Sequence, residues 1–338
     1  MILPVYNGAQ WIDGCMHALL RQTWVRRHRL DVVDSHGEAH PGDAAAVITD
    51  GADAATAVDA TTADDATAAV DAVVHSNDGL IELSAYDDGS TDESWHRLLT
   101  WWAPYLRQRG WLVTLGRGTP PARGCGHAKN RAVAQSSGEW LCFQDVDDLS
   151  LPERLERQLA ACRRRSGCLV GCQVRRQPEG STARYIRWAN GMSEAQLVLH
   201  RFRECTLLMP TWFMARATFE ASGRFREEKC EDLLFLQAHV LRGGSLHRVD
   251  VVLVEYRYHA AAATHAIPRQ TLLHHRVSAI EVAILEHWPH FSIWGAGRDG
   301  RDFFKALQPR LRQRVVAFCD VDEKKVRWRR WLRPTMLT

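Results

Sequence analysis

The sequence predicts an α/β fold built around a mostly parallel sheet, and three observations support this prediction. Apolar strand-like segments alternate with helix-like segments along most of the chain. The content of 46% hydrophobic and 25% charged residues is ordinary for a globular protein. Polar motifs directly follow three of the predicted strands, at positions 6–7, 87–88 and 145–148. Because ligands bind beyond the carboxyl ends of strands in such sheets, these motifs predict one shared site.

The first half of the chain supplies most of the predicted elements. Residues 2–5 read as the end of a strand, and the helical pattern of residues 9–22 follows at once. A strand at 80–86 leads through Asp-Asp-Gly-Ser into a helix at 91–106, whose start is rich in residues that cap helices. We expect this strand to adjoin the later strand at 139–144. The remaining predicted elements are a strand at 111–115, a helix at 128–135 and a strand at 249–254.

One segment interrupts this pattern. Residues 31–77 contain a long stretch, 43–74, made almost entirely of Ala, Asp, Thr and Val without aromatic residues. Such a composition buries too little apolar surface to offset the entropy of ordering the chain. We interpret residues 31–77 as a low-complexity, disordered insertion in a surface loop.

The most informative motif follows the strand at 139–144. The apolar run Trp140–Phe143 gives way to three carboxylates within four residues, at Asp145, Asp147 and Asp148. Asp145 and Asp147 are two positions apart, so their side chains point to one side of an extended segment. Carboxylate oxygens suit Mg²⁺ or Mn²⁺, which proteins commonly share with substrate phosphates. A solvated acidic turn is the alternative interpretation.

Four motifs together resemble the family 2 glycosyltransferases of the GT-A fold, the fold of nucleotide-diphospho-sugar transferases. They occur in the family's order and read Leu-Pro-Val-Tyr-Asn at 3–7, Asp-Asp-Gly-Ser-Thr-Asp at 87–92, Asp-Val-Asp-Asp at 145–148 and Glu-Asp at 231–232. Further segments are similar to an animal N-acetylglucosaminyltransferase-like branch of that family, namely 126–130, 134–138, 209–213, 256–259 and 315–322. The resemblance implies a GT-A domain over residues 1–265 that transfers a sugar, N-acetylglucosamine in that branch, from a UDP-sugar donor.

The resemblance also implies which residues bind the donor. Asp88 accepts a hydrogen bond from the uracil, with Asp87 as its neighbour, and the backbone around Pro4 and Tyr6 forms the floor under the base. Capping of the next helix is the structural alternative for Asp88. Lys129 lies at a predicted helix start after Gly124 and Gly126, where a cation and free N–H groups suit a diphosphate. A solvated surface lysine is the alternative.

The same resemblance assigns the metal and the chemistry. Asp147 coordinates Mn²⁺ or Mg²⁺, and Asp145 holds the ribose or a metal-bound water. His259 is a further metal or phosphate contact, with structural packing as its alternative. Asp232 is the general base that takes the proton of the acceptor hydroxyl in an inverting transfer. Glu231 contacts the acceptor, and an acidic cap in the first turn of a helix is the alternative for this pair.

A glycine motif near the end of the chain supports a different hypothesis. The predicted strand 291–294 runs into Gly295-Ala-Gly-Arg-Asp-Gly300, and a second strand, 315–319, ends at Asp320. This spacing fits a dinucleotide-binding turn, so an NAD-dependent oxidoreductase or nucleotide-sensing module is the alternative function. The structural alternative is that the glycines only permit a helix to pack closely against a strand. We expect a helical linker at 266–288 and a short Rossmann-like unit at 289–338. A non-catalytic sugar-nucleotide binder is a third possibility.

Bulk properties exclude some classes of protein. The net charge of +3 argues against a dedicated nucleic-acid binder, and no apolar run reaches the roughly 18 residues of a membrane span. Nine cysteines without a zinc-ligand spacing, and no leader-like start, favour reduced thiols in the cytoplasm. The acceptor, whether a glycan, a protein or a small molecule, is not encoded in any motif.

Overall fold

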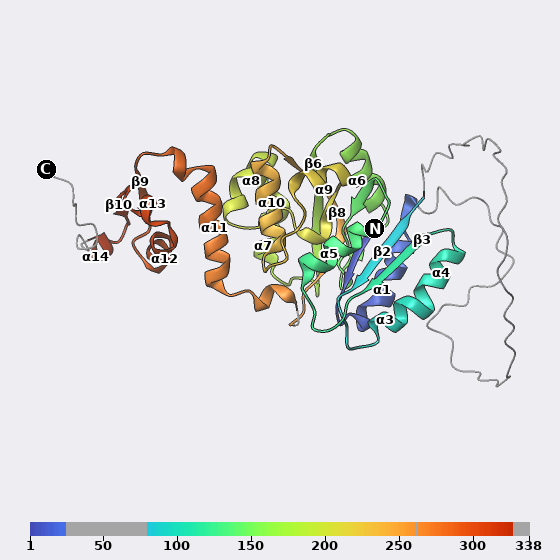
Figure 1. Ribbon diagram of the computed structural model, residues 1–338. Coiled ribbons are helices and arrows are strands. Elements are labelled where there is room, and N and C mark those ends of the chain that lie inside the picture. The colour runs from blue at the N-terminus through green and yellow to red at the C-terminus, as the bar shows by residue number, and fades with distance from the viewer. Residues whose placement is uncertain (25–79, 261, 327–338) are drawn as a thin grey trace, which may run out of the picture.

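A computed structural model of the chain describes residues 1–24, 80–260 and 262–326. The predicted insertion at 31–77 therefore lies outside the described residues. Figure 1 shows the arrangement: three strands and their helices at one end, a larger mixed sheet in the middle and a small unit at the other end.

The first sheet is parallel and has the strand order β1 (Ile2–Val5), β2 (Glu82–Asp87) and β3 (Leu112–Arg117). Alternate side chains of β2 point to opposite faces. Leu83 and Ala85 belong to the cluster that includes side chains of α1 (Ala9–Leu20) and α4 (Ala103–Gln108). On the other face, Ser84 donates a hydrogen bond to the carbonyl of Ala132 in α5 (Cys125–Ala134). Both faces of this sheet are therefore covered by helices.

The second sheet is mixed, which differs from the mostly parallel sheet that we predicted. Its strand order is β4 (Trp140–Cys142), β7 (Phe213–Ala215), β6 (Cys168–Gln177), β8 (Ser245–Arg257) and β5 (Leu149–Ser150). Strands β6 and β8 are parallel, whereas the other three pairs are antiparallel. The parallel pattern thus holds for the first sheet and only for one pair of the second.

The two sheets meet where Ile2 pairs with Phe143, just after β4. The amide of Gln144 donates to the carbonyl of Ile2 at 3.0 Å. Our prediction that the strand at 80–86 adjoins the strand at 139–144 is wrong, because Ile2 also pairs with Ser84 and so β1 lies between them. The carboxyl ends of β1, β2 and β4 still share one edge, since all three run in the same direction.

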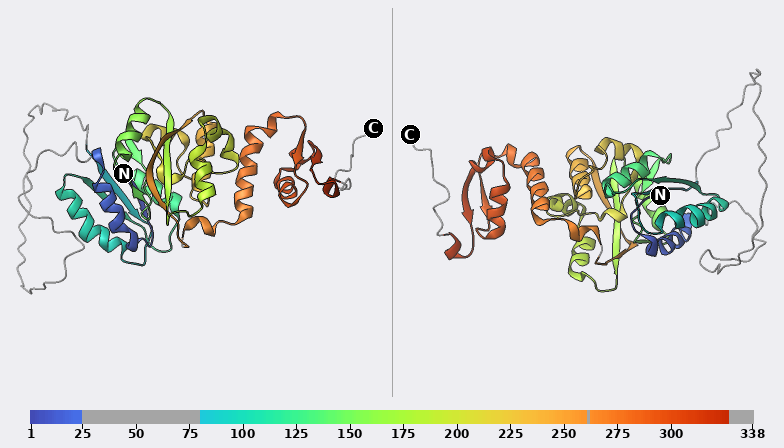
Figure 2. Two further views of the ribbon diagram at one scale, coloured as in Figure 1. Left: turned by 180° about the vertical axis from the view of Figure 1, so that it is seen from behind. Right: turned by 60° about the horizontal axis from the view of Figure 1, so that its bottom comes forward.

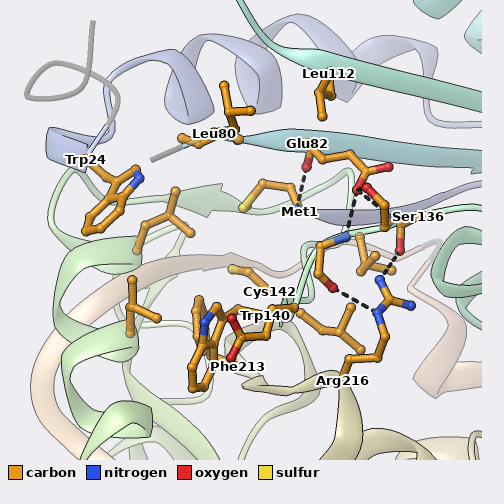
Figure 3. A pocket seen from close by; sticks show the side chains of 18 of the residues that line it. Met1, Trp24, Leu80, Glu82, Leu112, Ser136, Trp140, Cys142, Phe213 and Arg216 are labelled. Carbon is orange, nitrogen blue, oxygen red and sulfur yellow. Dashed lines mark hydrogen bonds between the residues drawn. The ribbon is translucent and has the colours of Figure 1, made fainter. Parts of the chain in front are cut away.

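The opposite edge carries a pocket of about 450 Å³, which Figure 3 shows from close by. Its polar groups bond to one another: Glu82 accepts from the amides of Ser137 and Gly138, and Arg216 donates to the hydroxyl of Ser136. Met1 lies in the same lining, with its amino group on the carbonyl of Glu82 at 2.6 Å. This pocket lies at the start of the strands, away from the acidic motifs.

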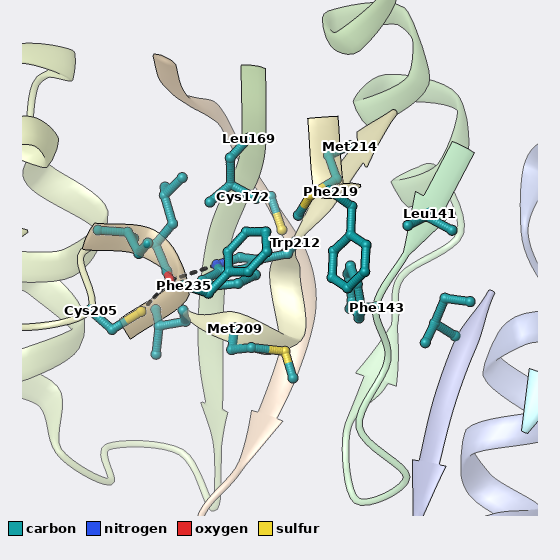
Figure 4. Close-up of a cluster of buried hydrophobic side chains, with 14 of the residues drawn as sticks. Leu141, Phe143, Leu169, Cys172, Cys205, Met209, Trp212, Met214, Phe219 and Phe235 are labelled. Carbon is teal, nitrogen blue, oxygen red and sulfur yellow. Dashed lines mark hydrogen bonds between the residues drawn. The ribbon is translucent and has the colours of Figure 1, made fainter. Parts of the chain in front are cut away.

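The second sheet is backed by a large apolar cluster rich in aromatic rings (Figure 4). Trp212 and Phe219 are fully buried. The centroid of the Phe235 ring lies 5.3 Å from that of Trp212, in a tilted arrangement, and 5.4 Å from that of Phe219, in a stacked one. The helices around this sheet are α6 (Arg154–Arg163), α7 (Ala183–Gly191), α8 (Glu194–Leu199), α9 (Arg216–Ser222) and α10 (Glu231–Leu241). Phe235 belongs to α10, so the cluster fixes the helix that starts with the Glu-Asp motif.

Helix α11 (Arg269–Ala283) leads to the small unit at the far end, as Figures 1 and 2 show. The unit contains a parallel pair, β9 (Phe291–Trp294) and β10 (Val315–Cys319). Its helices are α12 (Arg298–Ala306), α13 (Pro309–Arg312) and α14 (Glu323–Val326). Val277 of α11 joins its separate apolar cluster. Residues 269–283 are therefore helical, and a β-α-β order follows them.

Most of the other predicted helices and strands also occur, with shifted ends. The predicted helix at 91–106 consists of α3 (Ser94–His96), a π-helical turn at Arg97–Trp102, and α4. Strand β8 is much longer than the predicted 249–254, because it pairs along the whole of β6. Within the described ranges, no helix has the length and apolar character needed to cross a membrane.

Candidate active site

The loops after β1 and β2 are tied to each other by polar side chains. Asn7 has a left-handed backbone with a φ of 47°, and its amide donates to the Ser90 hydroxyl at 2.8 Å. Its side-chain oxygen accepts from the amide of Thr91 at 2.9 Å. Tyr6 is 53% exposed, and Pro4 is partly buried in β1. The loop that we predicted to lie under a nucleotide base is thus rigid and carries an accessible aromatic ring.

Asp87 and Asp88 are both buried, and both hold the surrounding loops. Asp87 accepts from the amide of Ser90 at 3.2 Å and from Arg117 at 3.1 Å. One oxygen of Asp88 accepts from the amides of Arg123 and Gly124, at 2.8 and 2.7 Å. Asp88 therefore holds the loop that leads into α5. In the described structure its hydrogen bonds do not go to the start of the next helix along the chain, α3, so the capping role that we stated as the alternative is not observed. Asp87 is 0% exposed, so its effect on a ligand is through the loop that it holds.

The three carboxylates after β4 come together in one turn. Each of Asp145, Asp147 and Asp148 offers an oxygen within 4.8 Å of the others. Asp145 and Asp147 are half-buried, whereas Asp148 is fully buried. Asp148 accepts from the amide of Arg257 at 2.8 Å, and its second oxygen is buried without a hydrogen-bond partner in the described structure. Burial raises the pKa of Asp148 well above its ordinary value.

The end of β8 packs against this turn. Nε2 of His259 lies 2.9 Å from a carboxylate oxygen of Asp147, and the Arg257 guanidinium donates to the Asp147 carbonyl at 2.9 Å. Trp11 of α1 contacts both, with its ring 5.4 Å from that of His259 and 4.9 Å from the Arg257 guanidinium. The structure thus brings His259 to the acidic turn, as predicted, and adds Arg257 and Trp11.

Lys129 pairs with the motif at the start of α10. Its ammonium donates to a carboxylate oxygen of Glu231 at 2.8 Å; Lys129 is buried and Glu231 is half-buried. Burial acts to lower the pKa of Lys129, but the carboxylates of Glu231 and Asp145 outweigh it and hold the pKa above its ordinary value. Lys129 is therefore a permanent cation between the two acidic motifs.

Asp232, next to Glu231, remains half-buried and free of an ion pair in the described structure. One of its oxygens accepts from the amide of Leu233 at 2.7 Å in the first turn of α10. Burial and the charge of Glu231 raise the pKa of Asp232 to about 6, while Lys129 opposes the shift. Asp232 is thus ionised at neutral pH yet more basic than an exposed aspartate, as a proton acceptor should be.

Asp145 belongs to the same electrostatic group although it is 87 positions away from Asp232. Burial, opposed by Lys129 and reinforced by Asp147, raises the pKa of Asp145 to about 6. Glu231 and Asp232 also contribute to this shift. The fold therefore assembles the acidic turn, Lys129 and the start of α10 into one site at the carboxyl edge of the sheets.

The glycine motif at 295–300 lies in the separate C-terminal unit. Gly295 has a φ of 94°, and a side chain at Gly300 would overlap the carbonyl of Gly295. The carboxylate of Asp320 accepts from the amides of Ala296 and Asp322, both at 2.9 Å. Asp320, which in a dinucleotide site would face the ribose, is thus used to hold the glycine loop.

Sequence reasoning missed several residues that support the site. Arg257, Gln144 and Arg154 contact the acidic turn or the backbone that leads into it, and Trp11 packs against Arg257 and His259. The Tyr-Arg-Tyr-His motif at 256–259 was a usable signal, although only its histidine carried a prediction. All nine cysteines are free.

The chain is similar to known glycosyltransferases in sequence and in structure. Residues 62–221 match the family described as Glycosyl transferase family 2. TarS of S. aureus in complex with UDP-GlcNAc aligns over 84% of this chain and 66% of its own, with 15% identity and a TM-score of 0.50. Its complex with UDP aligns over 94% and 82%, with 14% identity and a TM-score of 0.50.

A third similar structure is the mannosyltransferase PcManGT from Pyrobaculum calidifontis in complex with GDP-Man and Mn²⁺. It aligns over 83% of this chain and 62% of its own length, with 15% identity and a TM-score of 0.52. At such identities these structures establish the GT-A fold. The alignment covers less than two thirds of the length of the TarS chain with UDP-GlcNAc, and less than two thirds of the length of PcManGT.

Proposed function

We propose that this chain, which carries a glycosyl transferase family 2 domain over residues 62–221, is a metal-assisted inverting hexosyltransferase. It moves a sugar from a nucleotide-sugar donor to an acceptor hydroxyl. The observation that carries this proposal is the convergence of Asp145, Lys129 and Asp232 on one site, since these groups come from three separate segments. Structural roles alone do not require two carboxyls with pKa values near 6 around a buried lysine.

The acidic turn fits a divalent cation. Asp145 and Asp147 supply half-buried carboxylates within 4.8 Å of each other, and Asp148 contributes a buried oxygen without a partner. Hard oxygen donors of this kind suit Mn²⁺ or Mg²⁺. The ion supplies positive charge that stabilises the departing diphosphate. Asp147 and Asp145 would hold it, with His259 beside Asp147.

The chain's own residues divide the remaining work. The loops at 4–7 and 87–91 form the base-binding side, with Pro4 and Tyr6 under the base and Asp88 beside it. Lys129 places a fixed cation near the diphosphate. Because Lys129 also bonds to Glu231, Glu231 does not act as the base. Asp232 takes the proton of the attacking hydroxyl, because it is ionised and makes no ion pair in the described part of the chain. Glu231 then helps to shape the acceptor side.

We propose UDP-N-acetylglucosamine as the donor. The proposal rests on the sequence resemblance to the animal β-1,3-N-acetylglucosaminyltransferase-like protein 1, and TarS shows that this fold binds UDP-GlcNAc. PcManGT binds GDP-Man with the same fold, so GDP-mannose is the main competing donor. Residues 1–265 would form the transferase domain, 266–288 the linker and 289–338 the appended unit.

A donor screen tests the proposal directly. Thermal unfolding of the full chain should be measured with UDP-GlcNAc, UDP-Gal, UDP-Glc and GDP-Man, each with and without Mn²⁺. We expect UDP-GlcNAc with Mn²⁺ to raise the unfolding temperature most, since a ligand at 100 times its Kd stabilises by about 2.7 kcal/mol. Failure of every sugar nucleotide to stabilise the chain in Mn²⁺ would refute the function, and a preference for GDP-Man would refute the donor.

A further inference from the structure

A buried arginine lies directly beneath the acidic turn. Arg154 is the first residue of α6 and is 0% exposed. In the described structure it makes no ion pair with a carboxylate. Burying an unpaired charge costs several kcal/mol, and a cation at a helix N-terminus is also opposed by the helix dipole. The position therefore requires another reason for an arginine.

The hydrogen bonds of Arg154 supply that reason. Its Nε donates to Gln158 at 3.0 Å, and its two terminal nitrogens donate to four further acceptors. These are the side chains of Gln144 and Ser150, both at 2.9 Å, and the carbonyls of Phe143 and Pro210, at 2.7 and 2.6 Å. All five N–H groups of the guanidinium are used. The arginine therefore holds the backbone that runs from β4 into the acidic turn.

Gln144 transmits this constraint to the turn itself. It is 0% exposed, and its oxygen accepts from Arg154 and from the hydroxyl of Ser150 at 2.5 Å. Its amide nitrogen donates to the carbonyls of Asp145 and Asp148, at 2.7 and 2.9 Å. Gln144 therefore holds the backbone of the turn at Asp145 and Asp148, on either side of Asp147.

We propose that Arg154 is a positioning residue for the metal-binding turn and that it acts through Gln144. This inference rests on the proposed function, because it assumes that the turn binds a divalent cation. Partners that orient metal ligands typically contribute 10- to 100-fold to metal affinity. The chain should therefore lose Mn²⁺ affinity when the link is broken, even though every carboxylate is retained.

Two glutamines that bond to the same arginine provide a matched pair of variants. Gln144→Glu keeps an acceptor for Arg154 but removes the amide that holds the two turn carbonyls. Gln158→Glu makes the same change on the other side of Arg154, where the amide donates to the carbonyls of Thr211 and Val170. The negative charge that Gln144→Glu adds would by itself strengthen Mn²⁺ binding. Weaker Mn²⁺ binding in this variant must therefore come from the loss of the two bonds that position the turn.

The experiment is a Mn²⁺ titration of the full chain without donor, followed by the electron paramagnetic resonance of free Mn²⁺. We expect the Kd of Gln144→Glu to rise by about 10- to 100-fold, and that of Gln158→Glu to stay within about threefold of wild type. Thermal unfolding in EDTA checks that both variants fold. Equal Kd values for the two variants would overturn the inference, whereas a wild-type chain that binds no Mn²⁺ would overturn the metal site and the inference with it.

A second variant covers the case in which Gln144→Glu does not fold. Arg154→Lys keeps the charge but has three N–H groups on one nitrogen and cannot reproduce the five bonds of the planar guanidinium. We expect it to lose Mn²⁺ affinity to a similar extent. Wild-type affinity in folded Arg154→Lys would show that the fork of hydrogen bonds does not position the turn, and would overturn the inference.

Discussion

Asp147 and Asp232 act on different stages of the proposed reaction, and substitution separates them. Asp147→Asn removes a metal ligand, so it should abolish the Mn²⁺-dependent binding of UDP-GlcNAc. Asp232→Asn should leave donor affinity nearly unchanged and lower the rate of transfer by on the order of 10²- to 10⁴-fold, the usual effect of a general base. Donor affinity is measured by calorimetry and transfer by release of UDP.

The comparison has a clear contrary result. Equal loss of donor affinity in both variants would make Asp232 a binding or structural residue. The base would then be reassigned to Glu231 or withdrawn. Asn at position 232 retains the oxygen that accepts from the Leu233 amide, so the helix start should be preserved.

The pH dependence of transfer follows from the same carboxylate. A general base must be ionised, and the pKa of Asp232 is about 6, so kcat/KM should fall as the pH drops below about 6. Glu231→Gln removes an anion that raises this pKa, and the acidic limb should therefore move to lower pH. The pH profiles of both proteins give the test. A Glu231→Gln protein without an acidic limb would identify Glu231 as the base instead.

The sequence predicted which residues gather at the site better than it predicted their contacts. Asp145, Asp147, Lys129, Glu231, Asp232 and His259 all lie in one region. The pairing of Lys129 with Glu231 was not predictable, because it depends on how α5 approaches the segment before α10. Gln144 and Arg154 were missed for a related reason: a glutamine and an arginine in a sequence give no sign of being fully buried.

At the scale of elements, one glycine allows α5 to approach α10. Gly126 is buried, and a Cβ there would overlap the carbonyl of Arg226 and lie 3.2 Å from Cβ of Glu231. Gly126→Ala should therefore push α5 away, weaken donor binding and destabilise the chain by about 1–3 kcal/mol. Denaturant unfolding and donor titration measure the two effects.

The control for this variant is a Gly→Ala substitution at a position where an added Cβ contacts no other atom. Gly191 ends α7, and no atom lies within 4 Å of the position of its Cβ. Gly191→Ala should be neutral or stabilise the chain by up to about 1 kcal/mol, because alanine favours helix. Similar destabilisation at both positions would show that close packing of α5 is not the cause.

Local sequence patterns predicted elements well where an element has its own apolar period, as in α1 and α5. They failed where partners decide the outcome. Strand β7 and most of β8 gain their extent from pairing with β4 and β6, so no local pattern marks their bounds. The position of β1 between β2 and Phe143 is also set by long-range pairing.

At the scale of the whole molecule, the two candidate nucleotide sites predict different ligands. The C-terminal unit uses Asp320 to bond the amide of Ala296 within its glycine loop. We therefore expect NAD⁺ and NADH to leave the unfolding temperature unchanged, while UDP-GlcNAc with Mn²⁺ raises it. Differential scanning fluorimetry of the full chain provides the measurement. Stabilisation by a nicotinamide dinucleotide would restore the oxidoreductase hypothesis.

The pairing of Ile2 with Phe143 has a consequence for how the chain responds to its donor. The loops that we propose to bind the base belong to the first sheet, whereas the acidic turn follows β4 of the second, so a donor bound as proposed would span the junction. The amide of Gln144, which donates to the carbonyl of Ile2 across that junction, should exchange its hydrogen with solvent more slowly when UDP and Mn²⁺ are both bound. Uridine alone contacts one side and should leave this exchange rate unchanged. The exchange rate of this one amide would then show whether a ligand bridges the two sheets.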